Sequence, residues 1–492
     1  WEATLQRRHA DNNANLYTVP TAAIRSGDMS GSTTLIYDPA SGNPDGTGRT
    51  PFANKMIPVT RQSTIVTQGI LPLLPQPSFP NLLTSNYYAS GRQYNRRQQI
   101  DSKISYTASN KLTLSGRVSL TPFLVFCDSA FGNDGLQGPP LYGNAWIQGT
   151  TNGNFWNGSA QALYQVRPNL IVDTAFGYTL EDYNEVPPGA TTNFGDQLGI
   201  PGANGPRPQV PLYVHDPQFD YAANANWTKG NHNIRFGGEL RREHMNHWEP
   251  YAAIASFSFN GNMTSLKGGP GPNQYNSWAD FLLGIPSSIS KNPPWEQITT
   301  RVWFYRLYLR DQWQVSRKMT VSFGLGWEFY PPASRENRGL ELYYFSDNTL
   351  MICGEGDSPT DCGLQVSKKL FAPRVGIAYR INEGFVARAG YGISYDTWSV
   401  ARDVSYVYPV RGTYSAPVAN SYSPAGSLAT GIPVQTPPDL SSGSIPMPLN
   451  ISTATPANPY VRPYIQSFNV TLQKELKWGW VAQAGYVATR TI

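Results

Sequence analysis

The feature that most constrains the fold is a stretch of strict alternation near the middle of the chain. From residue 319 to 329, every second residue is large and apolar, and each residue between is small or polar. The apolar set comprises Met319, Val321, Phe323, Leu325, Trp327 and Phe329, and the other set comprises Thr320, Ser322, Gly324, Gly326 and Glu328. Successive side chains of a strand point to opposite faces, so this pattern predicts a strand with one apolar and one polar face.

The length of this strand indicates its environment. Residues 308–315 form a second strand before it, and a turn of about three residues joins the two. Strands of soluble proteins usually extend over about five or six residues, whereas a tilted strand needs about nine to eleven to cross a bilayer. The hairpin is therefore long enough for a membrane. We expect Phe323, Leu325 and Trp327 on the outer surface of the sheet and Glu328 facing inward.

The composition agrees with a wall between lipid and water. Charged residues make up 14% of the chain and aromatic residues 13%, yet the mean hydropathy is −0.39. A barrel that alternates lipid-facing and water-facing side chains combines these properties. No apolar run approaches 18 residues, so no transmembrane helix is predicted. The net charge of +5 is modest and no run of Lys and Arg contains interleaved aromatics, so nucleic acid is not an expected partner.

Hairpins recur along the chain, with short turns at one end and long connections at the other. The predicted turns, of about three or four residues each, lie near residues 109–111, 167–169, 229–232, 316–318, 382–384 and 476–479. The connections between hairpins cover about thirty residues or more, whereas soluble domains have median connections of about four to six. Periplasmic short turns and extracellular long loops are typical of an outer-membrane barrel. The predicted fold is all-β: an antiparallel up-and-down transmembrane β-barrel, here partial, with about 12–14 long strands.

The beginning of the chain has a different character. Residues 1–95 are expected to hold the start of the barrel and a long extracellular loop, and residues 96–492 the barrel hairpins and their loops. From residue 9 onward the first part lacks sustained periodicity and is rich in Pro, Gly, Asn, Ser and Thr, so it is predicted to be irregular. One or two helical turns are predicted at residues 63–74, where apolar residues share a face.

Several segments also resemble a known family. They are VPTAAIRSGDMSG at 19–31, ADFLLG at 279–284, DQW at 311–313, FAPRVGIAY at 371–379, RAGYGISYD at 388–396 and QSFNVTLQKEL at 466–476. In their order and spacing they resemble segments of the Oar-like TonB-dependent receptors of the bacterial outer membrane. The resemblance covers nearly the whole chain.

This resemblance implies a barrel of about 22 strands with a plugged lumen. Such receptors import large or scarce solutes with energy that TonB passes from the inner membrane. The resemblance therefore implies a transport protein rather than an enzyme, with no cofactor, whose partners are outer-membrane lipid, an unidentified solute and the TonB complex. By comparison with the family, residues 1–492 are expected to contain no plug, no TonB-box segment, no carboxypeptidase-like domain and no final aromatic strand. We expect the TonB contact in a plug outside this chain, and two unpaired sheet edges within it.

Charged residues opposite the apolar stripe are the candidate solute-binding groups. A charge that faces lipid at mid-depth costs roughly 2–4 kcal/mol, so these residues should face a water-filled lumen. They are Lys103, Arg117, Asp173, Arg235, Glu239, Arg241, Arg374, Arg380 and Arg388. As a set they could contact a solute or a plug, whereas for any single residue a merely hydrated wall is the simpler interpretation.

The remaining motifs predict a disulfide at most. Cys353 and Cys362 could form a bridge, with Cα atoms roughly 4.4–6.8 Å apart, or remain two free thiols. His244 and His247 are three positions apart on a strand, so they point to opposite faces and do not suggest a metal site. No Gly-x-Ser-x-Gly, Walker or Cys-x-x-Cys motif occurs. Neither catalytic nor metal-binding residues are therefore predicted.

Two other classes of protein remain open at this point. A secreted, soluble β-rich protein, carbohydrate-active or adhesive, would share the composition and would use loop aromatics to stack on sugars. Alternatively, an incomplete barrel with exposed sheet edges would promote assembly outside any membrane. Fractionation distinguishes the classes, because a membrane barrel requires detergent for extraction.

Overall fold

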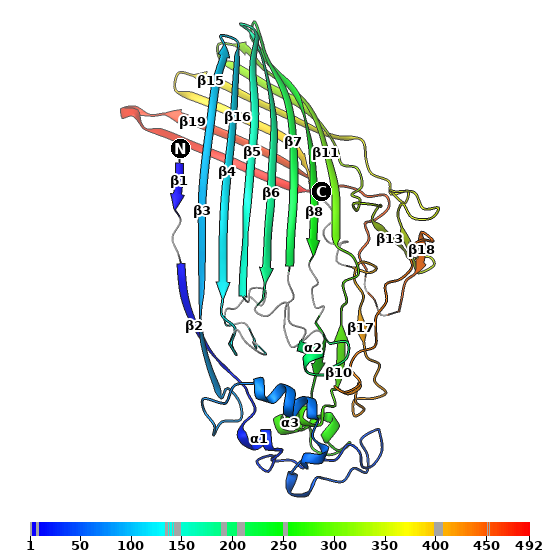
Figure 1. Ribbon diagram of the computed structural model, residues 1–492. Coiled ribbons are helices and arrows are strands. Elements are labelled where there is room, and N and C mark those ends of the chain that lie inside the picture. Colours follow the sequence, from blue (N-terminus) through cyan, green and yellow to red (C-terminus); the bar gives the residue numbers. More distant parts are fainter. Residues whose placement is uncertain are drawn as a thin grey trace.

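One large antiparallel sheet with loops gathered at one end makes up the computed structural model of the chain (Figure 1). The structure describes residues 2–5, 9–132, 136, 138–139, 141, 149–187, 194–203, 212–248, 254–397, 407–449, 451 and 453–492. The strands of the sheet are β1 (Glu2–Leu5), β2 (His9–Tyr17), β3 (Tyr87–Ser109), β4 (Leu112–Cys127), β5 (Gly149–Arg167), β6 (Leu170–Val186), β7 (Leu212–Lys229), β8 (His232–Trp248), β11 (Ile298–Ser316), β12 (Met319–Phe329), β15 (Leu370–Asn382), β16 (Phe385–Tyr395), β19 (Tyr464–Glu475) and β20 (Val481–Thr491).

The topology is up-and-down. β1 and β2 both pair with β3, and from β3 to β20 each strand pairs with the next strand of the sheet in chain order. The sheet curves, so that β15, β16, β19 and β20 run behind β3 to β11 in Figure 1. Within the described residues, β3 pairs with β1, β2 and β4, and β20 pairs with β19, so the two edges of the sheet do not meet.

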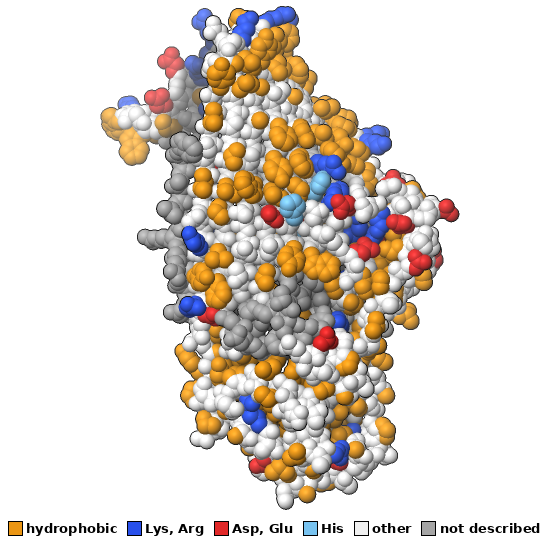
Figure 2. All heavy atoms as spheres, in the orientation of Figure 1, with side chains coloured by type: hydrophobic (Ala, Val, Ile, Leu, Met, Phe, Trp, Pro, Cys, Tyr) orange, Lys and Arg blue, Asp and Glu red, His pale blue; other side chains and the backbone are white. Residues whose placement is uncertain are grey.

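The predicted faces of the central hairpin are confirmed. Phe323 and Leu325 are exposed on the outer face, with about half of each side chain's surface accessible, whereas Glu328 lies on the other face and is only 4% exposed. Apolar side chains gather on the outer surface of the sheet, toward the short-turn end (Figure 2). The all-β, up-and-down fold is therefore the one that the alternation predicts.

The hairpins are longer and their turns tighter than the sequence indicates. Five of the six turns have two residues between the strands, such as Arg317 and Lys318 between β11 and β12. β3 has 23 residues. At about 3.3 Å per residue it extends over about 76 Å, far beyond the nine to eleven residues or so that a bilayer crossing requires. The strands therefore continue past the membrane into the loop end, where both faces meet water and the alternation is lost.

The prediction that residues 9–95 are irregular is wrong at both ends of that range. β2 pairs with the first part of β3, from His9 opposite Asn95 to Tyr17 opposite Tyr87. The β2 sequence, HADNNANLY, has no alternation of apolar residues, and β3 begins at Tyr87, nine residues before the predicted hairpin region that starts at residue 96. Backbone pairing alone fixes these segments, so side-chain periodicity could not reveal them.

Four loop segments fold together at the long-loop end into a globular unit that we call the cap (residues 18–86, 194–203, 254–291 and 412–432). Its elements are α1 (Ala22–Ser26), η1 (Ala53–Lys55), η2 (Val59–Arg61), η3 (Ile65–Ile70), η4 (Leu71–Leu73), α2 (Phe194–Gln197), β9 (Ser256–Ser258), η5 (Asn262–Thr264), α3 (Gln274–Leu283), β10 (Ser288–Lys291) and β17 (Tyr414–Ser415). η3 and η4 confirm the predicted helical turns. Ile24, Val66, Leu198, Leu282 and Leu428 meet in one buried core, so all four segments contribute to it. Among the described helices, none combines the length and apolarity needed to cross a bilayer.

The longest helix of the cap is well defined at both ends. Asn273 accepts hydrogen bonds from the backbone of Tyr275 and Asn276, and Gly284 ends α3 with φ of +68°. The α3 side chain Asp280 is fully buried. Its carboxylate accepts hydrogen bonds from the Thr264 hydroxyl at 2.8 Å and from the Met263 N–H at 3.3 Å. These bonds fix α3 to η5.

A second unit, the disulfide module, comprises residues 330–366 and 440–449. β13 (Glu341–Tyr344), β14 (Thr349–Ile352) and β18 (Ser444–Pro446) form its small sheet. Cys353 and Cys362 are joined by a disulfide with Cα atoms 5.1 Å apart, within the range expected from the sequence.

Asp280 should make the stability of the cap depend on pH. Burial raises the pKa of Asp280 to about 7, although the bonds from Thr264 and Met263 favour the ionised form. This pKa lies above the pKa of an aspartate in the unfolded chain, so between the two values the Asp280 carboxyl binds a proton more tightly in the folded cap. The free energy of unfolding of the cap should therefore fall as the pH rises from about 4 to about 7. Asp280→Asn should remove this dependence, as measured by hydrogen exchange of cap amides at several pH values, corrected for intrinsic rates.

The control is Asp439→Asn, which changes an exposed carboxylate outside the cap. It should leave the pH profile of cap exchange unchanged. A cap in the unmodified protein that exchanges equally at pH about 5 and about 7.5 would contradict the assignment to Asp280.

Candidate functional site

The inner face of the sheet carries the polar half of the alternation and forms the candidate site. The register places all nine predicted residues on this face, in rows that run across the strands. Most of the nine form ion pairs or hydrogen bonds that the sequence did not reveal. The strand register decides which residue of the next strand each side chain meets.

The first group lies between β3, β4 and β5. Arg117 forms an ion pair of 2.9 Å with Asp101, whose other oxygen accepts a hydrogen bond from Gln99 at 2.7 Å. Lys103 stands directly opposite Arg117 in the register. A hollow of about 430 Å³ in the inner wall is lined by Asp101, Lys103 and Arg117 together with Ser115, Ser159 and Gln161. It therefore offers two cations, one of them paired with a carboxylate, and several neutral hydrogen-bonding groups to the lumen.

A second group surrounds Arg241 on β8. Its guanidinium lies 2.6 Å from Asp220, 3.3 Å from Glu239 and 3.7 Å from Glu243. Phe304 on β11 lies under the same guanidinium, 5.9 Å from ring centroid to Cζ. One cation thus neutralises part of the charge of three carboxylates on two strands, which leaves this part of the wall acidic.

A third group crosses from β6 to β11 over a glycine. The Asn224 amide donates to Asp173 at 2.7 Å, and the Tyr308 hydroxyl donates to the Asn224 carbonyl oxygen at 2.5 Å. Gly237 lies between Asn224 and Tyr308 in the register, and a Cβ there would overlap the Asn224 oxygen. The glycine therefore lets the tyrosine reach across β8.

The remaining predicted residues divide into bonded and open side chains. Arg388 donates to the Gln473 side chain at 2.7 Å, and Arg380 donates to the Arg317 carbonyl at 3.3 Å. Arg235 and Arg374 are exposed on the wall. Arg306, which the sequence analysis did not select, pairs with Glu328 at 3.1 Å.

The two histidines lie as the strand geometry requires. The His247 Nε2 atom is 2.7 Å from Asp216 on the inner side, whereas His244 packs against the ring of Phe219. In the described part of the chain, no three residues that could bind a metal gather together.

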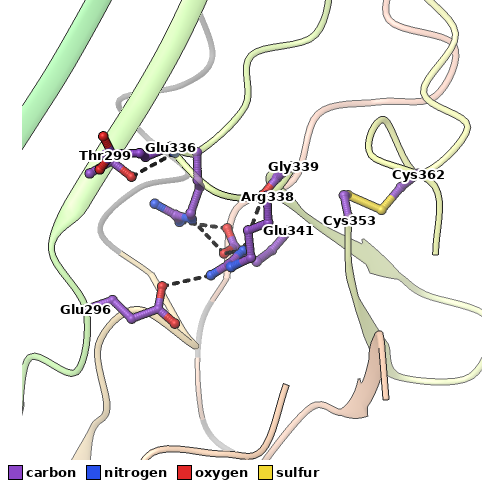
Figure 3. Close-up of polar contacts among 9 residues, drawn as sticks. Glu296, Thr299, Glu336, Arg338, Gly339, Glu341, Cys353 and Cys362 are labelled. Carbon is purple, nitrogen blue, oxygen red and sulfur yellow. Dashed lines mark hydrogen bonds and ion pairs between the residues drawn. A yellow bond between two sulfur atoms is a disulfide. The ribbon is translucent and has the colours of Figure 1, made fainter. Parts of the chain in front are cut away.

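Beside the mouth of the sheet, the disulfide module contains a buried cluster of charges (Figure 3). Arg335 binds both oxygens of Glu341 at 2.8 and 2.7 Å, and Arg338 bridges Glu341 at 2.5 Å and Glu296 at 2.9 Å. Glu341 is 2% exposed. Burial alone would raise the pKa of Glu341, but the two guanidinium groups outweigh it and hold this pKa below its ordinary value. The cluster therefore fixes the module to the β10–β11 connection.

An apolar outer face, a charged inner face and polarised loops define the wall of a membrane β-barrel. The chain belongs to the family of outer membrane beta barrel domains, which it matches over residues 1–492. The predictions of an outer-membrane barrel and of location in the bacterial outer membrane are therefore confirmed, while the Oar-like subtype stays a prediction. The curated proteins include no match to the chain.

Solved structures that match the chain share little sequence with it. They include the alcaligin outer membrane receptor FauA from Bordetella pertussis (11% identity, TM-score 0.38, covering 82% of this chain and 45% of that chain). The outer membrane transporter YddB from Escherichia coli is 11% identical, with a TM-score of 0.40, and the match covers 82% of this chain and 47% of that chain. The RagAB peptide transporter is 11% identical, with a TM-score of 0.41, and the match covers 82% of this chain and 42% of that chain. The chain thus spans less than half the length of each of these proteins.

Gly237→Ala should disrupt the Asp173–Asn224–Tyr308 group. The added Cβ would overlap both the Ala223 carbonyl and the Asn224 side chain, and the carbonyl belongs to a paired strand that cannot yield. We expect a loss of about 1–3 kcal/mol in the free energy of unfolding, measured by urea titration of the full-length protein in detergent. Gly158→Ala, where nothing lies within 4 Å of the added Cβ, is the matched control and should change stability by no more than about 0.5 kcal/mol.

Glu341→Ala should loosen the disulfide module. The substitution leaves Arg335 and Arg338 buried without their common carboxylate, which costs about 3–5 kcal/mol for a broken buried pair. Hydrogen exchange of the β13 and β14 amides should accelerate strongly, whereas Asp357→Ala, at an exposed carboxylate of the same module, should leave it unaltered. Equal exchange in the two variants would show that the charge cluster does not hold the module.

Proposed function

We propose that the chain forms the barrel wall of an outer-membrane receptor that imports a large or scarce solute with energy supplied through TonB. The observation that supports this proposal is the inner wall, where charged groups are fixed in cross-strand pairs opposite an apolar outer face. The wall acts in binding and passage, not in catalysis. The family assignment favours this function over a secreted, soluble protein.

The pairing of the charges suits a passage better than a tight binding site. Groups such as Asp101 with Arg117, and Asp220 with Arg241, present hydrogen-bonding atoms to the lumen while each has a partner of opposite charge. Passage requires sites that are favourable enough to enter and weak enough to leave. A solute can therefore move along such a wall by exchanging one partner for the next.

The cap and the disulfide module are the parts that a solute would meet first. Both lie at the long-loop end, which faces the outside of the cell in an outer-membrane barrel. We propose that selection of the solute takes place on these loops and that the inner wall serves its transfer.

Uptake by whole cells tests the proposed function. Cells that produce the full-length protein, and matched cells that lack it, would receive labelled solutes too large for general porins: a ferric siderophore, an oligopeptide and an oligosaccharide. We expect at least one of them to accumulate only in the producing cells, and an uncoupler of the proton-motive force to abolish that accumulation. Accumulation that survives the uncoupler would instead indicate a passive pore.

A further inference from the structure

Six of the luminal arginines fall into two sets that the sequence does not distinguish. Arg117, Arg241 and Arg306 each form an ion pair with a carboxylate on a neighbouring strand. In contrast, Arg235, Arg310 and Arg374 are all exposed on the inner face, and no carboxylate of the described chain lies within ion-pairing distance of them. The second set therefore leaves an uncompensated positive charge on the wall.

The three arginines of this set stand in one row across adjacent strands. Arg235 on β8 is directly opposite Arg310 on β11, which is opposite Gly324 on β12, which in turn is opposite Arg374 on β15. We call these four residues the arginine row. Neighbouring strands are about 4.8 Å apart, so Arg310 and Arg374 flank a gap of about 10 Å.

From β8 to β16, the described residues in the two rows that flank the arginine row are all neutral. Between β8 and β16, the flanking rows on the same face hold Asn233, Gln312, Ser322, Gly376 and Gly390 toward the short turns, and Gly237, Tyr308, Gly326 and Ala372 toward the loops. Like charges directly opposite each other destabilise a sheet. The row is thus an arrangement that a bound anion would stabilise.

Two glycines leave space on the inner face between the arginine side chains of the row. Gly324 places no side chain between Arg310 and Arg374. The aliphatic part of Arg374 leans away from Gly324 and over Gly392, where an added Cβ would lie 3.3 Å from the Arg374 Cγ atom. An anion above Gly324 would lie between Arg310 and Arg374, and the Arg374 side chain must turn from Gly392 toward β12 to reach it. Arginine binds carboxylate and phosphate in a bidentate manner, which suits this geometry.

We propose that the arginine row is a binding site for the oxyanion group, carboxylate or phosphate, of a solute in the lumen. The site lies near the short-turn end, so it would act late in transfer, after the acidic stretch around Arg241. This inference rests on the proposed transport function and specifies the chemical class of its cargo.

Citrate is the probe for the site, because it carries several carboxylates in a small molecule. Its binding to the purified full-length protein in detergent would be measured by calorimetry at low ionic strength. We expect Arg310→Gln and Arg374→Gln each to weaken citrate binding about tenfold or more. Lys111→Gln removes one exposed cation at the short-turn rim outside the row and should leave the affinity unchanged. Heat-modifiable migration in gels verifies that each variant is folded.

Two results would overturn the inference. Citrate affinities of Arg310→Gln and Arg374→Gln equal to that of the unmodified protein would show that the row does not bind the anion. An unmodified protein that binds no citrate, and that melts at a lower temperature once the arginines are replaced, would assign the row to an acidic segment of the protein itself. Uncoupler-sensitive uptake of a neutral solute would in either case leave the transport function standing, so the two proposals fail separately.

Discussion

Satisfaction of the backbone hydrogen bonds within one continuous ladder is the constraint on which the rest of this structure depends. The bilayer core offers no water to an N–H or C=O group, so every strand that crosses it must be paired. The β4–β5 register, for example, is unbroken from Leu112 opposite Tyr164 to Cys127 opposite Gly149. At the short end, two-residue turns join the strands of five of the six hairpins, and in four of these the register shifts by one residue next to the turn. Because the ladder is continuous, each inner-face residue has a fixed neighbour on the next strand, which is why charge pairs such as Asp220 with Arg241 form in rows.

The same constraint explains where charges are tolerated. At mid-depth a charge on the lipid side costs roughly 2–4 kcal/mol, and the cost falls toward the interfaces. Asp311 is the instructive exception, because it lies on the outer face of β11. It is 7% exposed, its carboxylate is 2.6 Å from the His232 Nδ1 atom, and the His232 ring stacks on Trp313 with centroids 5.4 Å apart. Its place near the short-turn rim, its partner and its aromatic cover together reduce the penalty of that position.

The sequence predicts those parts of the structure in which the two faces of a strand meet different solvents. The alternation at 319–329 therefore indicates the strand, its faces and the inward position of Glu328. β2 and the first part of β3 carry no such signal, because their sequences do not alternate between apolar and polar residues. Partners on the inner wall also escape prediction: Tyr308 reaches Asn224 only because register places Gly237 between them. The cap could not be predicted, since its core joins residues as distant in sequence as Ile24 and Leu428.

The long strands and the cap together determine how the mouth of the barrel can change. Strands that extend well past the bilayer hold the loop segments at fixed positions, as the pairing of β2 with the first part of β3 does for the start of the cap. All four cap segments share one apolar core, and Asp280 adds buried hydrogen bonds between α3 and η5. Movement of a single segment would expose that core to water, at about 25 cal/mol for each Å² of apolar surface. It follows that the four cap segments move together rather than as independent loops.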